Sequence, residues 1–127
     1  MSLFSLTGKV IHGNHLGRTL GYPTANLDLE PDAVPPGSAG VYAARVYFGQ
    51  KTFGGMANIG YRPTIRQNGF TVEVHLFDFS GDLYGKLLTV EFTERIRDEV
   101  KFDSLEALTA QMQRDELRVR KTLSGLL

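Results

Sequence analysis

The hydrophobic and polar residues of this chain follow a two-residue period over most of its length. Short segments rich in β-branched and aromatic side chains alternate with glycine-rich turns, which is typical of strands joined by tight loops. The pattern predicts five strands: Leu6–His12, Gly40–Phe48, Thr52–Ile59, Thr71–Phe79 and Leu87–Phe92. Glycine and proline are frequent between the first two strands, so that region is predicted to be irregular.

The segment "TVEVHLFDF" (71–79) shows the alternation most clearly. One face carries the aliphatic residues Val72, Val74 and Leu76, and the other carries Glu73, His75 and Phe77. The aliphatic face is therefore predicted to lie in the core. Asp78 falls on that face, which indicates that it lies at the end of the strand.

The period changes near residue 104 and becomes helical, predicting one helix over about 104–124. The apolar stripe comprises Leu105, Leu108 and Met112, continued less regularly by Leu117, Val119 and Leu123. Asp103 is predicted to cap the helix, with Glu106 reaching back to it. Five or six strands followed by one amphipathic helix predict a closed antiparallel β-barrel with the helix packed on it, because closure removes exposed strand edges.

Length and composition narrow the class of protein. The 127 residues are expected to form a single domain, and the absence of cysteine excludes disulfides and thiolate metal sites. The net charge of zero argues against nucleic acid as a partner, and no apolar stretch is long enough to span a membrane. Because the start has no signal-peptide pattern, we expect a cytoplasmic protein, either a module of a longer chain or a single-function protein.

The segment "GRTLGYPTANL" (17–27) has loop composition. In the wider loop from Gly13 to Asn26, glycines such as Gly13 let backbone N–H groups approach an anion, and Arg18 adds a positive charge. Thr24 and Asn26 project to the same side of an extended chain. They could cap a turn, or they could bind Mg²⁺ if a nucleotide supplies the negative charge.

Two further features permit either an ordinary or a functional interpretation. Glu73 is a solvated strand glutamate, or it is a general base if its face lines a cleft. In "IRDEVKF" (96–102), Arg97 and Phe102 could bind a planar ligand by charge and stacking. Alternatively, this segment is a charged connector with Phe102 packed in the core.

Five stretches together resemble the riboflavin kinase family. They are "GKVIHGNHLGRTLGYPTANL", "GVYAARV", "MANIGYRPT", "VEVHLFDFSGDLYG" and "IRDEVKFDSLEALTAQMQRD", and they cover nearly the whole chain in the family's order. The resemblance implies a six-stranded antiparallel Greek-key β-barrel with a C-terminal α-helix. It also implies transfer of the ATP γ-phosphoryl group to the ribityl 5′-hydroxyl of riboflavin, giving FMN and ADP.

The resemblance also implies roles for particular residues. It assigns Thr24 and Asn26 to Mg²⁺ and the phosphates, and Glu73 to the catalytic base. The implied nucleotide contacts are Gly13, Arg18, Leu76, Asp78 and Tyr84, together with the two metal ligands. The implied flavin contacts are Arg97, Val100 and Phe102. Ile65 departs from the phenylalanine that commonly follows the Arg-Pro-Thr motif.

Other functions remain as alternatives. A non-catalytic flavin- or nucleotide-binding barrel would need Arg97 and Phe102 but not Glu73 together with Thr24 and Asn26. A flavoprotein oxidoreductase would be yellow and oxidise NAD(P)H. The related bacterial enzymes often carry an N-terminal FMN adenylyltransferase domain, which nothing in this sequence resembles, so we expect FMN but no FAD as product.

Overall fold

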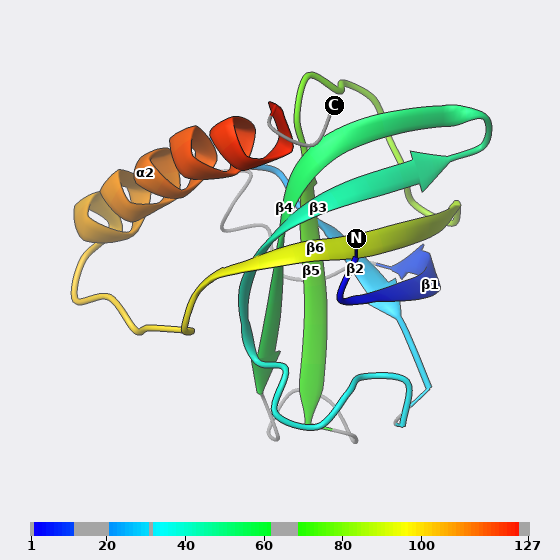
Figure 1. Ribbon diagram of the computed structural model, residues 1–127, viewed down its shortest axis with the longest axis horizontal. Coiled ribbons are helices and arrows are strands. Elements are labelled where there is room, and N and C mark those ends of the chain that lie inside the picture. The colour runs from blue at the N-terminus through cyan, green and yellow to red at the C-terminus, as the bar shows by residue number, and fades with distance from the viewer. Residues whose placement is uncertain (1, 12–20, 31, 62–68, 125–127) are drawn as a thin grey trace.

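The computed structural model describes all residues except 1, 12–20, 31, 62–68 and 125–127. Its elements are β1 (Phe4–Ile11), β2 (Ala25–Asp28), β3 (Gly40–Phe48), β4 (Lys51–Tyr61), β5 (Phe70–Leu76), β6 (Leu87–Arg97) and α2 (Leu105–Ser124). The strands form a closed antiparallel barrel in the order β1-β2-β5-β4-β3-β6 (Figure 1). The predicted class, a six-stranded β-barrel with a C-terminal helix, is confirmed.

The barrel core is filled by the inward residues of every strand. The largest fully buried side chains are Phe92, Leu27, Ile59, Leu88, Val46, Val74, Val90 and Val119, of which all but Val119 lie inside the barrel. On β5 the aliphatic face is buried as predicted, because Val72, Val74 and Leu76 all belong to this core. Among the described residues, no helix is long and apolar enough to cross a membrane.

The sequence pattern misses or misplaces three features of the barrel. It does not predict β2, a strand of only four residues that joins β1 to β5 and completes the closure. It extends β5 to Phe79, whereas β5 ends at Leu76. Asp78 lies in the turn that follows, with a positive φ of 59°. It also ends the last strand at Phe92, whereas β6 continues to Arg97.

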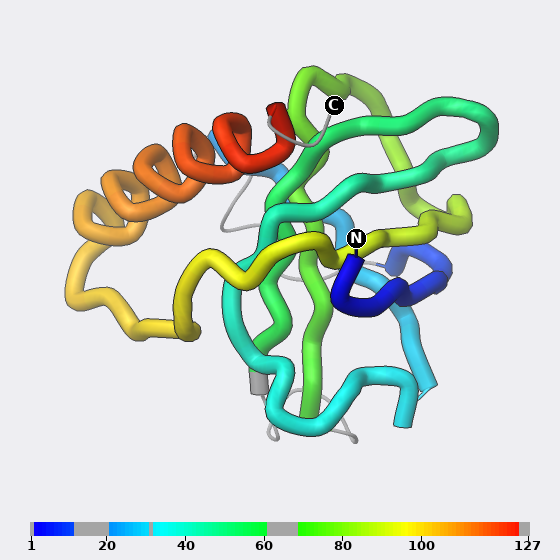
Figure 2. The backbone as a smooth tube through the Cα atoms, viewed as in Figure 1, coloured from blue at the N-terminus to red at the C-terminus, as the bar shows by residue number. Residues whose placement is uncertain are grey.

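Helix α2 packs against the outside of the barrel. After β6 the chain runs away from the barrel and returns as α2, so that residues 98–104 form a connection at one side (Figure 2). A second apolar cluster fills the space between helix and barrel; it includes Val41, Ala43, Met56, Phe77, Ile96, Val119 and Leu123.

The buried face of α2 confirms Val119 and Leu123 of the predicted stripe but differs from it at Leu105 and Leu117. Its buried residues are Asp115, Val119 and Leu123, spaced by four residues, whereas Leu105 and Leu117 are 53% and 72% exposed. The first turns of the helix extend beyond the barrel wall (Figure 1), so Leu105 has less to pack against. Leu117 is two residues from both Asp115 and Val119, which places it on the opposite, exposed side of the helix. The helix cap also differs, because Ser104 rather than Asp103 accepts the hydrogen bond from the N–H of Ala107 (3.1 Å).

Candidate active site

A row of directly paired residues crosses five strands on the outside of the barrel. The register pairs Asn26 with Glu73, Glu73 with Asn58, Asn58 with Val41, and Val41 with Arg97. Asn26, Glu73, Asn58 and Val41 alternate with core residues along their strands, and so they face outward. Arg97 is on the same side, because it contacts Asp115 of α2. We call these five residues the cross-strand row, and it brings together positions separated by up to 71 residues of chain.

The polar end of the row is formed by β2 and β5. The hydroxyl Oγ1 of Thr24 donates a hydrogen bond to Oε1 of Glu73 at 3.4 Å. Asn26 lies directly across from Glu73, and both side chains are half-buried. Thr24, Asn26 and Glu73 therefore form one cluster of oxygen-bearing side chains, in which Glu73 supplies the negative charge.

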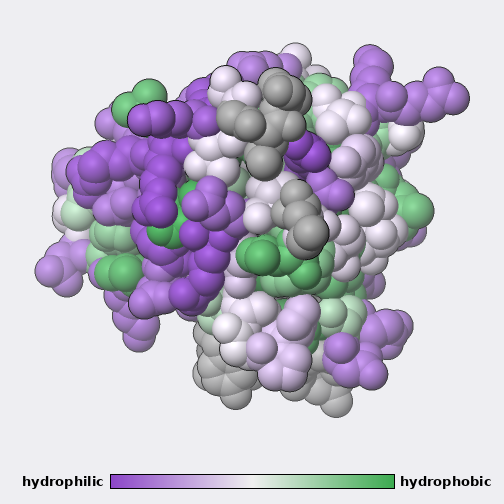
Figure 3. All heavy atoms as spheres, viewed as in Figure 1, coloured by the Kyte–Doolittle hydropathy of each residue, from purple (hydrophilic) through white to green (hydrophobic). Residues whose placement is uncertain are grey.

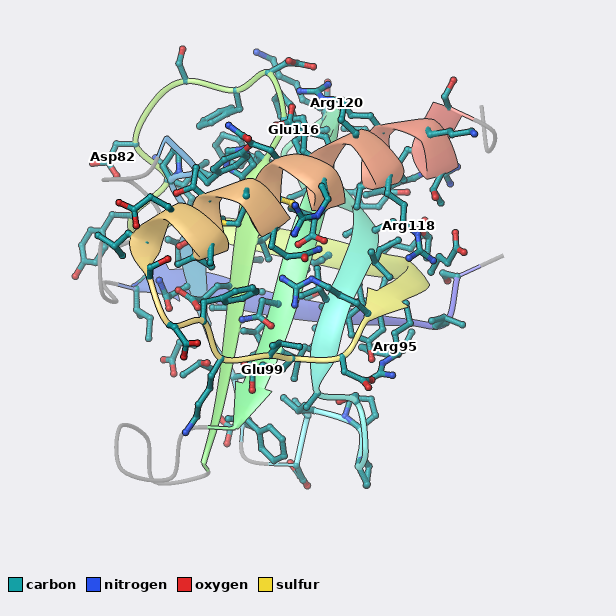
Figure 4. All side chains as sticks on the ribbon, turned by 90° about the vertical axis from the view of Figure 1, so that its left-hand side faces the viewer. Asp82, Arg95, Glu99, Glu116, Arg118 and Arg120 are labelled. Carbon is teal, nitrogen blue, oxygen red and sulfur yellow. The ribbon has the colours of Figure 1, made fainter. Side chains whose placement is uncertain are left out.

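A pocket of about 630 Å³ lies beside this cluster. It is bounded by the barrel face, the connection 98–104 and the first turns of α2, and Figure 4 views the molecule from this side. Its apolar lining includes Val41, Met56, Val100, Phe102, Leu108 and Met112. The volume and the mixed lining are those of a site for a small organic ligand.

The far wall of the pocket is held by a buried ion pair. Arg97 Nε lies 3.0 Å from each carboxylate oxygen of Asp115, and Arg97 Nη2 lies 2.8 Å from Oδ2. Gln111 Nε2 donates a further hydrogen bond to Asp115 Oδ1 at 2.9 Å. The Arg97 guanidinium carbon lies 5.7 Å from the ring centre of Phe102. Helix α2 thereby fixes both the end of β6 and the start of the connection.

A second polar network joins the other half of α2 to the barrel. Arg120 pairs with Asp78 through two contacts of 3.2 Å and with Glu116 at 2.8 Å, and its guanidinium carbon lies 4.3 Å from the ring centre of Phe77. These hydrogen bonds keep the pKa of Asp78 and of Glu116 below their usual values. Figure 4 shows Glu116 and Arg120 along the same side of the helix.

This network also reaches the segment that carries Thr24. The Tyr22 hydroxyl donates to Glu116 Oε1 at 3.0 Å, and burial together with this carboxylate raises the pKa of Tyr22. His75 Nδ1 lies 2.7 Å from the carbonyl oxygen of Pro23. These contacts with α2 and β5 hold Tyr22 and Pro23 in place just before the chain reaches the pocket at Thr24.

Five of the residues predicted from the sequence line the pocket: Thr24, Glu73, Arg97, Val100 and Phe102. Asn26 lies next to them through its pairing with Glu73. The functional interpretation of Glu73 required a cleft on its face of β5, and the pocket supplies one. Arg97 has its guanidinium engaged by Asp115, which the sequence did not indicate.

The other predicted residues lie elsewhere. Among the described residues, Leu76, Asp78 and Tyr84 do not line this pocket. The Leu76 side chain is in the barrel core, Asp78 is paired with Arg120, and Tyr84 is 53% exposed. Gly13 and Arg18, the predicted glycine-loop residues, lie outside the described residues.

Two residues of the site carried no clear signal in the sequence. Asn58 lies in the middle of the cross-strand row and lines the pocket, yet it appears only as a polar residue within an apolar strand. Asp115 occupies a buried position of α2, and its spacing of four from Val119 was the available indication. The residues that define these two positions, Glu73 across from Asn58 and Arg97 beside Asp115, are far away in the sequence, so local patterns cannot identify them.

Comparisons with known proteins agree with the family resemblance of the sequence. The family model for riboflavin kinase (Flavokinase) matches residues 2–123. A bifunctional riboflavin kinase/FMN adenylyltransferase from Haemophilus influenzae is 47% identical over 113 residues, or 88% of this chain. The chain spans just over a third of that relative, 36% of its length.

Two solved structures are similar to the whole barrel and helix. A protein described as a macrolide-efflux protein from Streptococcus pneumoniae matches 91% of this chain and 38% of its own, with a TM-score of 0.80 and 40% identity. A riboflavin kinase from Trypanosoma brucei matches 98% of this chain and 82% of its own, with a TM-score of 0.71 and 27% identity.

Proposed function

Because this chain belongs to the riboflavin kinase family, we propose that it transfers the γ-phosphoryl group of ATP to the ribityl 5′-hydroxyl of riboflavin. The products are FMN and ADP. The observation that carries this proposal is the arrangement along the cross-strand row: one pocket has a carboxylate with a hydroxyl partner at one end and apolar side chains such as Val100 and Phe102 at the other. A flavin has the matching shape, with a reactive hydroxyl at the end of a polar chain and a flat ring.

In this reaction Glu73 would act as the general base. The 5′-hydroxyl oxygen attacks the γ-phosphorus, the bond between that phosphorus and the bridging oxygen of ADP breaks, and the hydroxyl proton passes to the Glu73 carboxylate. Glu73 lines the pocket and accepts a hydrogen bond from Thr24, which orients one of its two oxygens. A positioned base of this kind contributes about 10²–10⁴-fold to a rate.

Thr24 and Asn26 would hold Mg²⁺ that arrives with ATP. Their neutral oxygens fit such an ion only when the phosphates add charge, and the described residues contain no group of three or more acidic, histidine or cysteine side chains suited to a metal. Bound in this way, Mg²⁺ supplies charge neutralisation for the phosphates, which is a main requirement of phosphoryl transfer. We also keep Gly13, Arg18, Leu76, Asp78 and Tyr84 as proposed nucleotide contacts.

The flavin ring would occupy the pocket beside the connection. Val100 and Phe102 present apolar surface there, and Arg97 lies at the start of the connection with its guanidinium carbon 5.7 Å from the ring centre of Phe102. The pocket lining combines these apolar side chains with polar ones such as Asn58, Glu73 and Asp115. On the face seen in Figure 3, most of the side chains around the helix are hydrophilic. Because ATP is required, we expect the reaction to take place in the cytoplasm.

The assay for this proposal is direct. The purified chain is incubated with riboflavin, ATP and Mg²⁺, and the flavins are separated by chromatography with fluorescence detection. We expect FMN and ADP in equal amounts and no FAD, although the bifunctional relatives carry a second, adenylyltransferase activity in their names. Bound flavin without FMN would favour a non-catalytic binding barrel, and consumption of NAD(P)H would favour an oxidoreductase.

A further inference from the structure

Asn58 is the member of the cross-strand row for which the reaction described above has no use. It lies on β4 between Glu73 on β5 and Val41 on β3, and it lines the same pocket. Its neighbours Ala57 and Ile59 are buried in the barrel core, so the Asn58 side chain belongs to the outer, pocket-facing side of the strand.

The carbonyl oxygen of this side chain has no partner among the residues that the structure describes. Asn58 Oδ1 is buried, and it accepts no hydrogen bond from any described residue. A buried acceptor left unpaired is costly, and native proteins rarely retain one without a functional reason. The same side chain lines the adjoining pocket, so a rotation of its amide group would turn the oxygen toward a ligand there, which could supply the missing donor.

The position of Asn58 defines which part of a flavin would supply that donor. Directly opposed residues of antiparallel strands have Cα atoms about 4.5–5.5 Å apart, so Asn58 is one strand away from the base and on the side of the flavin ring. If the 5′-hydroxyl is at Glu73 and the ring is near Phe102, the ribityl chain must pass over Asn58 and then Val41. That chain carries further hydroxyl groups, and Val41 can accept none of their hydrogen bonds.

We infer that Asn58 is a specificity-determining residue, whose Oδ1 accepts a hydrogen bond from a hydroxyl of the flavin's polyol chain. The inference rests on the proposed function, because it uses the flavin orientation given there. It explains why a polar side chain is placed between a carboxylate and a valine on the pocket wall. It also predicts that the site distinguishes flavins that carry a polyol chain from those that carry a hydrocarbon group instead.

The test compares two fluorescent flavins that share the same ring. Riboflavin has the polyol chain, whereas lumiflavin has a methyl group at that position and no hydroxyl. Equilibrium binding of each is measured by fluorescence, in the presence of ADP and Mg²⁺, for the wild type and for Asn58→Leu, which has similar size and no acceptor. Thr52→Val is the matched control, because Thr52 lies on the same face of β4, is exposed, and does not line the pocket.

We expect Asn58→Leu to weaken riboflavin binding about tenfold and to leave lumiflavin binding within about twofold. Thr52→Val should change neither. Asn58→Ala should reproduce the riboflavin effect if leucine proves too large for folding. Equal losses for both flavins, no loss for either, or a loss of ADP affinity instead would overturn the role of Asn58. These outcomes do not depend on turnover. If the wild type forms FMN but Asn58→Leu binds riboflavin normally, the role of Asn58 is rejected and the kinase function is kept. If the wild type binds no flavin at all, both proposals are rejected.

Discussion

The buried pair of Arg97 and Asp115 offers a quantitative test of how α2 supports the pocket. Among the described residues, Asp115 is the one buried residue with a charged side chain, and 3% of its surface is exposed. The Arg97 side chain is 21% exposed. We consider three changes: Asp115→Leu, Arg97→Met, and the two combined.

The expected loss in the free energy of unfolding depends on which of the two charges remains buried without its partner. Removing one partner of a buried pair typically costs about 3–5 kcal/mol. Asp115→Leu should fall near the lower end, about 3 kcal/mol, because the remaining guanidinium can still reach water. Arg97→Met should cost about 4 kcal/mol, because the Asp115 side chain is 4% exposed and, among the described residues, keeps the hydrogen bond from Gln111 alone. The double variant leaves no charge and should be within about 1 kcal/mol of the wild type.

Urea and thermal unfolding measure these differences. With about 2.1 cal/mol/K of unfolding entropy per residue, the 127 residues give about 0.27 kcal/mol/K, so a loss of 3 kcal/mol lowers Tm by about 11 °C. Asp98→Asn is the matched control. Asp98 forms a neighbouring pair with Arg95 at 2.7 Å, but the two side chains are 78% and 43% exposed, so it should cost less than about 0.5 kcal/mol. Single variants that cost as little as the control, or a double variant as unstable as the sum of the singles, would refute the reasoning.

Three further predictions concern strand packing, pH and the metal. Gly55→Ala should destabilise the barrel by about 2 kcal/mol in a urea titration, because the new Cβ would lie 2.6 Å from a backbone oxygen of β5. Gly54→Ala should cost less in the same titration, because its new Cβ meets the flexible end of a side chain at 2.9 Å. Arg120→Gln should lower Tm at pH 7, and this difference from the wild type should shrink as the pH falls below about 4. The reason is that Asp78 and Glu116, whose pKa values are lowered by Arg120, stabilise the fold only while they are ionised. A Tm difference that is the same at pH 7 and pH 3 would contradict this. Calorimetry should detect only weak Mg²⁺ binding to the free protein and clear binding with ADP, whereas tight binding to the free protein would argue against neutral ligands.

Much of the barrel was predictable because its information is local. The alternation in 71–79 identified the core face of β5 correctly, and the change of period identified the helix. The strand β2 was not predictable in this way, since four residues are too few for a period and its partners on β1 and β5 define it. The helix face was identified in part: Val119 and Leu123 are buried as predicted, whereas Leu105 lies where the helix extends beyond the barrel wall and Leu117 lies on the opposite side of the helix from them.

The candidate site was predictable to a lesser degree. The chemistry of Glu73 and Thr24 made them candidates, and the family resemblance gave them roles; in the structure they are joined by a hydrogen bond. Asn58 and Asp115 could not be selected, because their importance arises from strand register and helix docking across the chain. Asp78 illustrates the converse: its position on an aliphatic face indicated the end of the strand, but its pairing with Arg120 on a helix 42 residues away was not visible.

The most direct test of the central claim, that Glu73 is the base of a riboflavin kinase, is the rate of FMN formation by Glu73→Gln. The matched control is Glu94→Gln, because Glu94 is an exposed strand glutamate that does not line the pocket. We predict that Glu73→Gln keeps the wild-type unfolding curve and loses at least about 10²-fold in kcat, while the control retains full activity. A folded Glu73→Gln protein that forms FMN at a near-normal rate would contradict the account.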